Sequence, residues 1–150
     1  MLEVGHTERM ARMIAARTGG ELLKVEPVRV YPAGYRETTE IAQAEKNADA
    51  RPPVTTPQPD WSRCDVVFIG HPIWWGEMPM PMRTFLDGAK LSGKTLVHFV
   101  THEGSGFGES EATFGRYSAG ARTLEGIALG GRSVAESRSR VEAWLGRIGF

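Results

Sequence analysis

The sequence predicts a single α/β domain, residues 1–150, in which helices cover both faces of a parallel sheet. Two continuous runs rich in β-branched and aromatic residues, DVVFIG (65–70) and KTLVHFV (94–100), are typical of strands that are buried on both faces. Helical patterns alternate with strand patterns along the chain, which is typical of a parallel sheet with crossover helices. A length of 150 residues is also that of one ordinary domain.

The first part of the chain supplies a helix, a strand and a second helix. Residues 7–18 carry an apolar stripe at helical spacing, with Thr7 as the expected N-cap. ELLKVEPV (21–28) predicts a strand that Pro27 ends. Residues 36–50 are polar and rich in Ala, which predicts a surface helix. Residues 51–60 contain four prolines and are expected to form an extended connection.

The second part continues the alternation. A short helix is predicted over 80–89, directly after Pro79, and another over 109–117. TLEGIALG (123–130) predicts a further strand. The tail from Ser133 to Gly149 has one apolar stripe and is expected to form an amphipathic closing helix. The chain therefore predicts five helices and four strands.

Composition excludes several classes of protein. The 18 basic and 18 acidic side chains give a formal net charge of zero, so no long-range field attracts nucleic acid or an anionic membrane. No apolar run reaches the ~20 residues of a membrane span. No signal peptide is visible in the opening residues, and Cys64 is the only cysteine, which excludes an intramolecular disulfide. We therefore expect a cytoplasmic protein.

Ligands of open α/β sheets bind outside the carboxyl ends of the strands, so the segments that follow strands are the candidate site. GHPIWWGEMPMP (70–81) follows the first apolar run and holds Trp74 and Trp75 side by side on a loop stiffened by prolines. Adjacent aromatic rings in a connection favour a ligand or partner surface. The alternative is that Ile73 and one tryptophan cap the core.

The segment THEGSGFGES (101–110) follows the second apolar run and is rich in glycine. Successive backbone N–H groups of such a loop can face an anion or the edge of a ring, although most glycine-rich loops are only turns. His71, His102 and Glu103 are the candidate groups for acid–base chemistry.

Other polar residues near these loops are expected to serve structural or solvent-facing roles. Glu77 is expected to face solvent, and His98, which lies inside a strand pattern, is expected to be a hydrogen-bonded structural histidine. A metal site is disfavoured because the histidines and glutamates lack a regular spacing on one element.

Taken together, the motifs resemble the flavodoxin-like family, and more narrowly its bacterial flavodoxin and NAD(P)H-quinone-reductase-like branch with a PIWW loop. The segments that carry the resemblance are GHTERMARMIA, YPAGY, DWSRCDVVFIGHPIWWGEMPMPMRTFLD, SGKTLVHFVTHEGSGFG and LEGIALGG. The resemblance implies a three-layer sandwich around a parallel sheet of strand order 2-1-3-4-5, with FMN at the switch point.

The resemblance also assigns three groups of residues to the cofactor. The end of the phosphate loop corresponds to Gly5, His6 and Thr7. The two loops that flank the flavin ring correspond to Pro72, Ile73, Trp74, Trp75 and Gly76, and to Thr101, His102, Glu103, Gly104, Ser105 and Gly106.

One feature departs from the family. Its members begin with a strand and a Ser/Thr-rich turn, which residues 1–4 replace here. Losing several charge-assisted hydrogen bonds to the phosphate, at ~1.5–3 kcal/mol each, is expected to weaken or abolish FMN binding.

Three explanations for the missing strand stay open. The true start could lie upstream, the strand over 21–26 could move beside 65–70, or a second subunit could cover the gap. We expect a rearranged sheet of four strands, supported by a homodimer.

Three functions follow from this sequence. The first is FMN-dependent electron transfer, or the reduction of a quinone or another small molecule. The second is a flavin-free enzyme that reuses the aromatic cleft for dehydration, cyclisation or isomerisation of an apolar substrate, with His102, Glu103 or His71 as acid or base. The third is a non-catalytic protein whose Trp74–Trp75 surface binds another chain. A visible spectrum with and without FMN separates the first from the second.

Overall fold

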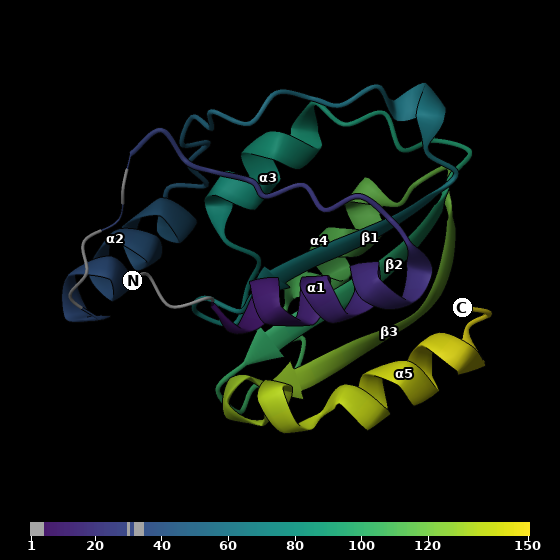
Figure 1. Ribbon diagram of the computed structural model, residues 1–150. Helices are drawn as coiled ribbons and strands as arrows, with labels where there is room; N and C mark the ends of the chain where they lie inside the picture. Colours follow the sequence, from purple (N-terminus) through teal and green to yellow (C-terminus); the bar gives the residue numbers. More distant parts are fainter. Residues whose placement is uncertain (1–4, 30, 32–34) are drawn as a thin grey trace.

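The computed structural model describes residues 5–29, 31 and 35–150, which form a three-layer α/β arrangement (Figure 1). None of the helices in these ranges is long and apolar enough to cross a membrane. The elements, in chain order, are α1 (His6–Thr18), α2 (Tyr35–Asn47), the 3-10 helix η1 (Trp61–Arg63), β1 (Val66–Pro72), α3 (Met80–Asp87), β2 (Thr95–His102), α4 (Ser110–Tyr117), β3 (Arg122–Gly130), the 3-10 helix η2 (Gly131–Glu136) and α5 (Arg138–Arg147).

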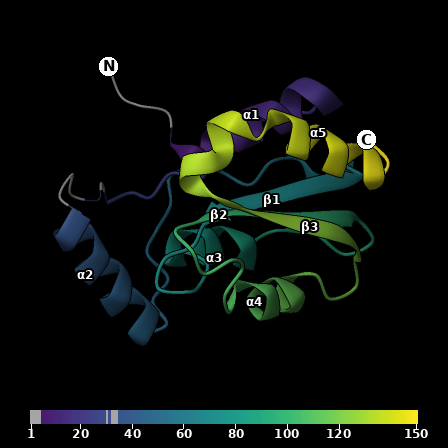
Figure 2. The same cartoon turned by 90° about the horizontal axis from the view of Figure 1, so that it is seen from below.

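The three strands form one parallel sheet in the order β1-β2-β3. Figure 2 shows α1 and α5 on one face of this sheet and α3 and α4 on the other. Pro72 at the end of β1 is paired with Thr101 near the end of β2, so the two strands stop at the same edge. The predicted α/β sandwich with a parallel sheet is therefore confirmed.

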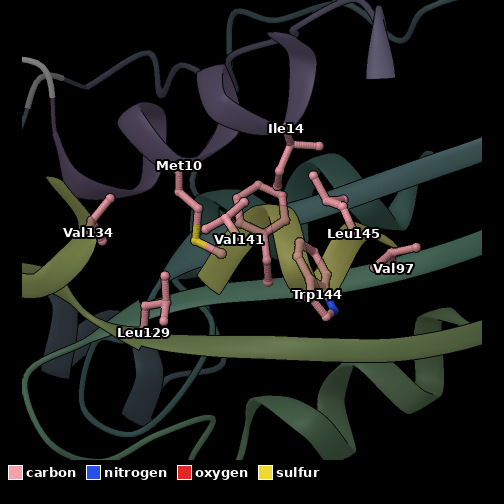
Figure 3. Packing of buried hydrophobic residues seen from close by; sticks show 9 residues of the cluster. Met10, Ile14, Val97, Leu129, Val134, Val141, Trp144 and Leu145 are labelled. Carbon is pink, nitrogen blue, oxygen red and sulfur yellow. The ribbon is translucent and has the colours of Figure 1, made fainter. Parts of the chain in front are cut away.

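Each face of the sheet has its own apolar core. Nine buried residues fill the space between the sheet and α1 and α5; those labelled in Figure 3 are Met10, Ile14, Val97, Leu129, Val134, Val141, Trp144 and Leu145. On the opposite face, α3 and α4 bury Phe85, Leu86 and Phe114 against the sheet. Burial of such side chains stabilises the fold by about 1.5–3 kcal/mol each. The two cores therefore hold the sheet, and with it its carboxyl edge, in place.

The segment 21–28 differs from its predicted strand. It is extended but makes only one isolated bridge, between Pro27 and Val54. Leu22 and Leu23 are 43% and 50% exposed, and of the apolar residues of 21–26 only Val25 packs against the core. A strand needs a neighbour for its backbone groups, and here the polar groups of 24–28 bond instead to the extended segment 53–56.

The predicted count of four strands is consequently wrong for the described residues, which contain three. The rearrangement that would place 21–26 beside 65–70 is not found. Instead, the outer edge of β1 has no strand partner within the described ranges. The departure at residues 1–4 lies outside the described residues.

Two helix boundaries also differ from expectation. The N-cap of α1 is Gly5, and Thr7 lies within the first turn, where its hydroxyl is 2.7 Å from the hydroxyl of Thr101. The closing helix expected over 133–149 is divided into η2 and α5 at Ser137. The Ser137 hydroxyl donates to the Ser133 carbonyl, so a local side-chain bond competes with a continuous helix at this point.

Candidate functional site at the carboxyl edge of the sheet

The carboxyl ends of the strands, the start of α1 and the whole of α2 lie at the same end of the molecule (Figures 1 and 2). The Thr7–Thr101 contact joins α1 to β2. Gly131, directly after β3, lies at the same place as the start of α1 and the loop after β2. A Cβ there would lie 2.7 Å from His6 Cδ2 and 3.0 Å from Glu103 Oε1, so three segments converge closely on this residue.

The first loop of the site is a tight turn centred on the two residues after Trp74. The Trp74 N–H donates to the Glu77 carbonyl at 2.9 Å, and the Glu77 N–H donates to the Trp74 carbonyl at 3.1 Å. Trp75 and Gly76 have φ values of 55° and 72°. Positive φ at both central positions is the mark of a type I′ turn, which prefers Asn-Gly. Trp75 is thus an L residue held in a disfavoured conformation.

Glu77 is buried, contrary to the solvent-facing role expected for it. Its Oε1 accepts the Met78 N–H at 2.8 Å, and its Oε2 accepts the Thr113 hydroxyl at 2.9 Å. Because Thr113 belongs to α4, this carboxylate fastens the tight turn to the helix beneath it. The prediction failed because nothing in the local sequence showed that α4 would supply a donor.

The second loop, which follows β2, owes its shape to glycine. Gly104, Gly106 and Gly108 all have positive φ, a region that only glycine occupies freely. The Gly104 N–H donates to Nδ1 of His102 at 2.9 Å, which turns that imidazole back onto its own loop.

The two loops are joined to each other. The Ile73 N–H donates to the Thr101 carbonyl at 2.9 Å, and the Glu109 N–H donates to the Gly76 carbonyl at 2.6 Å. A Cβ on Gly108 would collide with the same Gly76 carbonyl. The structure therefore brings the two predicted ring-contact segments into direct contact.

Helix α2 lies beside this end of the sheet (Figures 1 and 2). The Trp75 indole N–H donates to the Thr39 carbonyl of α2 at 2.7 Å. The edge of the Tyr31 ring meets the ring of Trp74 with centroids 5.3 Å apart, and the Tyr31 hydroxyl donates to the carboxylate of Glu45 in α2. Burial beside that carboxylate raises the pKa of the Tyr31 hydroxyl. Trp75 thus contacts α2 directly and Trp74 is linked to it through Tyr31, although the sequence identifies this helix only as a polar surface helix.

His71 and His98 form a buried pair beneath the loops. Their Nε2 atoms are 2.8 Å apart, and Nδ1 of His71 is 2.8 Å from the Pro72 carbonyl. A carbonyl only accepts, so His71 carries its proton on Nδ1 and its Nε2 accepts the Nε2–H of His98. The Nδ1 of His98 is then a bare, buried acceptor for which the described residues provide no donor.

This burial keeps both rings neutral. Loss of solvation lowers the pKa of His71 to about 4 despite its bond to Pro72, and lowers that of His98 to about 3, with the neighbouring His71 contributing. The structural role expected for His98 is confirmed. The acid–base role expected for His71 does not fit, because the ring is 1% exposed and bonded through both nitrogens.

The remaining predicted residues lie around the rim. Gly5, His6, Glu103, Gly104 and Ser105 are exposed, whereas Thr7, Ile73, His102 and Gly106 are half-buried. Thr101 is buried beneath the start of α1. In the part of the chain that the structure describes, no three His, Cys, Asp or Glu side chains are grouped to hold a metal ion.

Residues 2–148 match the family model described as flavodoxin. The chain belongs to the flavodoxin family. No curated protein matches it in sequence. Among solved structures, this flavodoxin-family chain is 31% identical to a candidate flavoprotein from Bacteroides eggerthii DSM 20697, with a TM-score of 0.82 over 98% of this chain and 92% of that one.

Two further structures share the fold of this flavodoxin-family chain. A candidate flavoprotein from Bacteroides uniformis ATCC 8492 is 24% identical, with a TM-score of 0.79 over 93% of this chain and 90% of that one. A flavoprotein from Lactobacillus acidophilus NCFM, solved in complex with FMN, is 22% identical, with a TM-score of 0.68 over 87% of this chain and 89% of that one.

Sequence reasoning missed three residues at the site of this flavodoxin-family chain. Gly131 was detectable, because it follows a predicted strand and so belongs to the same sheet edge. Glu109 lies in the candidate segment 101–110, but nothing in that segment distinguishes it from a solvent-facing residue. Lys46 was not detectable, since it lies on a polar stretch with the appearance of an ordinary solvated surface. Lys46 donates to the Trp75 carbonyl at 2.8 Å and is 3.4 Å from the Glu109 carboxylate.

Proposed function

We propose that this chain binds FMN at the carboxyl edge of its sheet and uses it to transfer electrons or to reduce a quinone or another small molecule. The narrower likeness to NAD(P)H-quinone reductases belongs to the same proposal. The observation that carries it is the arrangement of two interlocked loops, 73–77 and 103–109, beside the N-terminus of α1.

The donors near α1 suit a phosphate group. Gly5 occupies the N-cap and has no side chain to cap the first turn, so that turn is open to an anion. The Thr7 hydroxyl lies beside it. The one acidic residue of the first turn, Glu8, is neutralised by Arg12 at 2.9 Å and Lys24 at 3.1 Å, which reduces its repulsion of a phosphate.

The two loops suit a flat aromatic ring. Trp74 presents a half-buried indole whose orientation Tyr31 fixes, and the glycines of the second loop allow its backbone to approach a ring edge closely. FMN, when bound, supplies the reversible uptake of electrons. The protein's own part is to hold the ring, to exclude water from one of its faces and to set the hydrogen bonds at its edge.

A spectroscopic titration tests the proposal. We expect added FMN to show the shifted absorption of a bound flavin and to quench tryptophan emission. A Thr7→Val variant should weaken FMN binding but not riboflavin binding, because riboflavin has no phosphate. Thr84→Val is a matched control, since the Thr84 hydroxyl bonds only within α3.

The reaction class follows from a second measurement. Bleaching of the bound flavin by NADH or NADPH alone would favour a reductase, and its absence would favour an electron carrier. A colourless protein with no response to FMN or riboflavin would contradict the proposal and favour the flavin-free enzyme.

A further inference from the structure

The tight turn at Trp75 needs support from outside itself. Its two internal hydrogen bonds, between Trp74 and Glu77, are those of any two-residue turn of this kind. They do not favour an aromatic side chain over the Asn that such turns prefer at this position. Trp75 nevertheless holds φ at 55°, a conformation that is unfavourable for a residue with a bulky side chain. Contacts beyond the turn must stabilise it.

Those contacts come from α2 and involve both ends of Trp75. The indole N–H donates to the Thr39 carbonyl at 2.7 Å, near the middle of the helix. The backbone carbonyl accepts a hydrogen bond from Nζ of Lys46 at 2.8 Å, near the helix end. Because the carbonyl orients the Trp75–Gly76 peptide, the ammonium group fixes that peptide directly.

Lys46 also contacts the second loop. Its Nζ is 3.4 Å from Oε2 of Glu109, whose backbone N–H donates to the Gly76 carbonyl. A single ammonium group therefore lies where a carbonyl of the first loop and a carboxylate of the second loop meet. Its side chain is 30% exposed, so water competes only partly for these bonds.

From this geometry we propose that Lys46 is a positioning residue, which holds the Trp75–Gly76 peptide and both loops in the shape that receives the flavin ring. The role rests on the proposed function. It concerns the ring and not the phosphate, because Lys46 contacts the two loops and α1 supplies the phosphate donors. Lys46 acts through the loops and touches none of the reacting atoms.

The test compares Lys46→Ala with Lys46→Arg, and with Lys90→Ala as a matched control that removes an exposed lysine next to α3. Loss of one charge-assisted hydrogen bond corresponds to an affinity loss of about tenfold. We expect K46A to bind FMN and riboflavin with about tenfold lower affinity than the wild-type protein. K46R should recover most of the loss, because a guanidinium group can still reach a carbonyl and a carboxylate.

A second readout needs no flavin. The Trp75 indole N–H resonance of flavin-free protein reports its bond to Thr39, and K46A should shift it and speed its exchange with solvent. Glu109→Gln keeps the Lys46–Trp75 bond, so it should give a smaller change. Circular dichroism of each variant checks that the fold is retained.

The outcomes separate this role from the proposed function. If the wild-type protein binds neither flavin, the proposed function fails and the role of Lys46 fails with it. If the wild-type protein binds both and K46A binds them equally well, only the role of Lys46 is overturned. An unchanged Trp75 resonance in K46A, or a loss confined to FMN, would also overturn it.

Discussion

The buried His71–His98 pair should make folding stability depend on pH between neutrality and about pH 4. Both rings are neutral in the fold, with pKa values of about 4 and about 3, against 6.5 for a free imidazole. Unfolded chains therefore bind more protons than folded ones as the pH falls below 6.5, and acid favours unfolding. The stabilisation is fully present above pH 6.5 and is lost as the pH falls towards the folded pKa values.

The magnitude follows from the two pKa values. At about pH 5 an unfolded histidine is almost fully protonated, whereas each buried ring is still almost fully neutral. Each ring then accounts for about 2 kcal/mol between about pH 7.5 and about pH 5, and the pair for about 4 kcal/mol. That is a large part of the 5–15 kcal/mol typical of a domain.

Urea unfolding followed by circular dichroism, repeated across this pH range, measures the effect. A double variant, His71→Gln with His98→Leu, should flatten the dependence because neither replacement titrates. His102→Gln is the matched control and should leave the slope in place, since His102 lies on the rim. A flat profile in the wild-type protein, or an unchanged slope in the double variant, would refute this reasoning.

Three further outcomes are expected. Thr113→Val removes the donor to the buried Glu77 carboxylate and should lower the free energy of unfolding in urea by about 1–3 kcal/mol. Thr113→Ser keeps a hydroxyl and should lower it less, and equal losses in the two variants would contradict this. Gly70→Ala places a Cβ against the Phe99 ring and should lower the free energy of unfolding by about 1–3 kcal/mol. Adding Phe99→Leu should recover part of this stability. An unchanged stability in Gly70→Ala would show that the ring moves freely. We also propose that the edge of β1, which has no strand partner among the described residues and where Val66 is 37% exposed, pairs in a homodimer. Sedimentation should then give a dimer, and a monomer at all concentrations would refute this.

The sequence predicted the elements whose own residues form a continuous run suited to a buried strand. The runs 65–70 and 94–100 consist mostly of β-branched and aromatic residues, and their strands begin and end within two residues of expectation. The segment 21–28 has similar local propensity, but it pairs with the segment 53–56 through a single isolated bridge and joins no sheet. Strand formation depends on pairing across the fold, and a single segment cannot reveal whether a partner exists.

The site was predictable to the level of its loops and not to the level of its contacts. Loop position follows from strand position, which is why the segments after β1 and β2 were found. The burial of Glu77 depends on Thr113, 36 positions along the chain, and the support of Trp75 depends on Lys46, 29 positions away. Such pairs leave no local pattern, because Thr113 and Lys46 each have the appearance of an ordinary surface residue in the sequence.

Helix α2 is attached to the rest of the protein mainly by polar contacts, and this lowers the free energy needed to detach it. Of the α2 side chains that the structure describes, only Ala42 is buried, and polar contacts supply much of the rest of the attachment. Little apolar surface is exposed when such a helix detaches, so its opening free energy is far below that of the sheet. In hydrogen exchange, α2 amides should therefore exchange long before those of β2. We therefore expect a ligand to reach or leave the carboxyl edge when α2 alone detaches, while both cores stay closed.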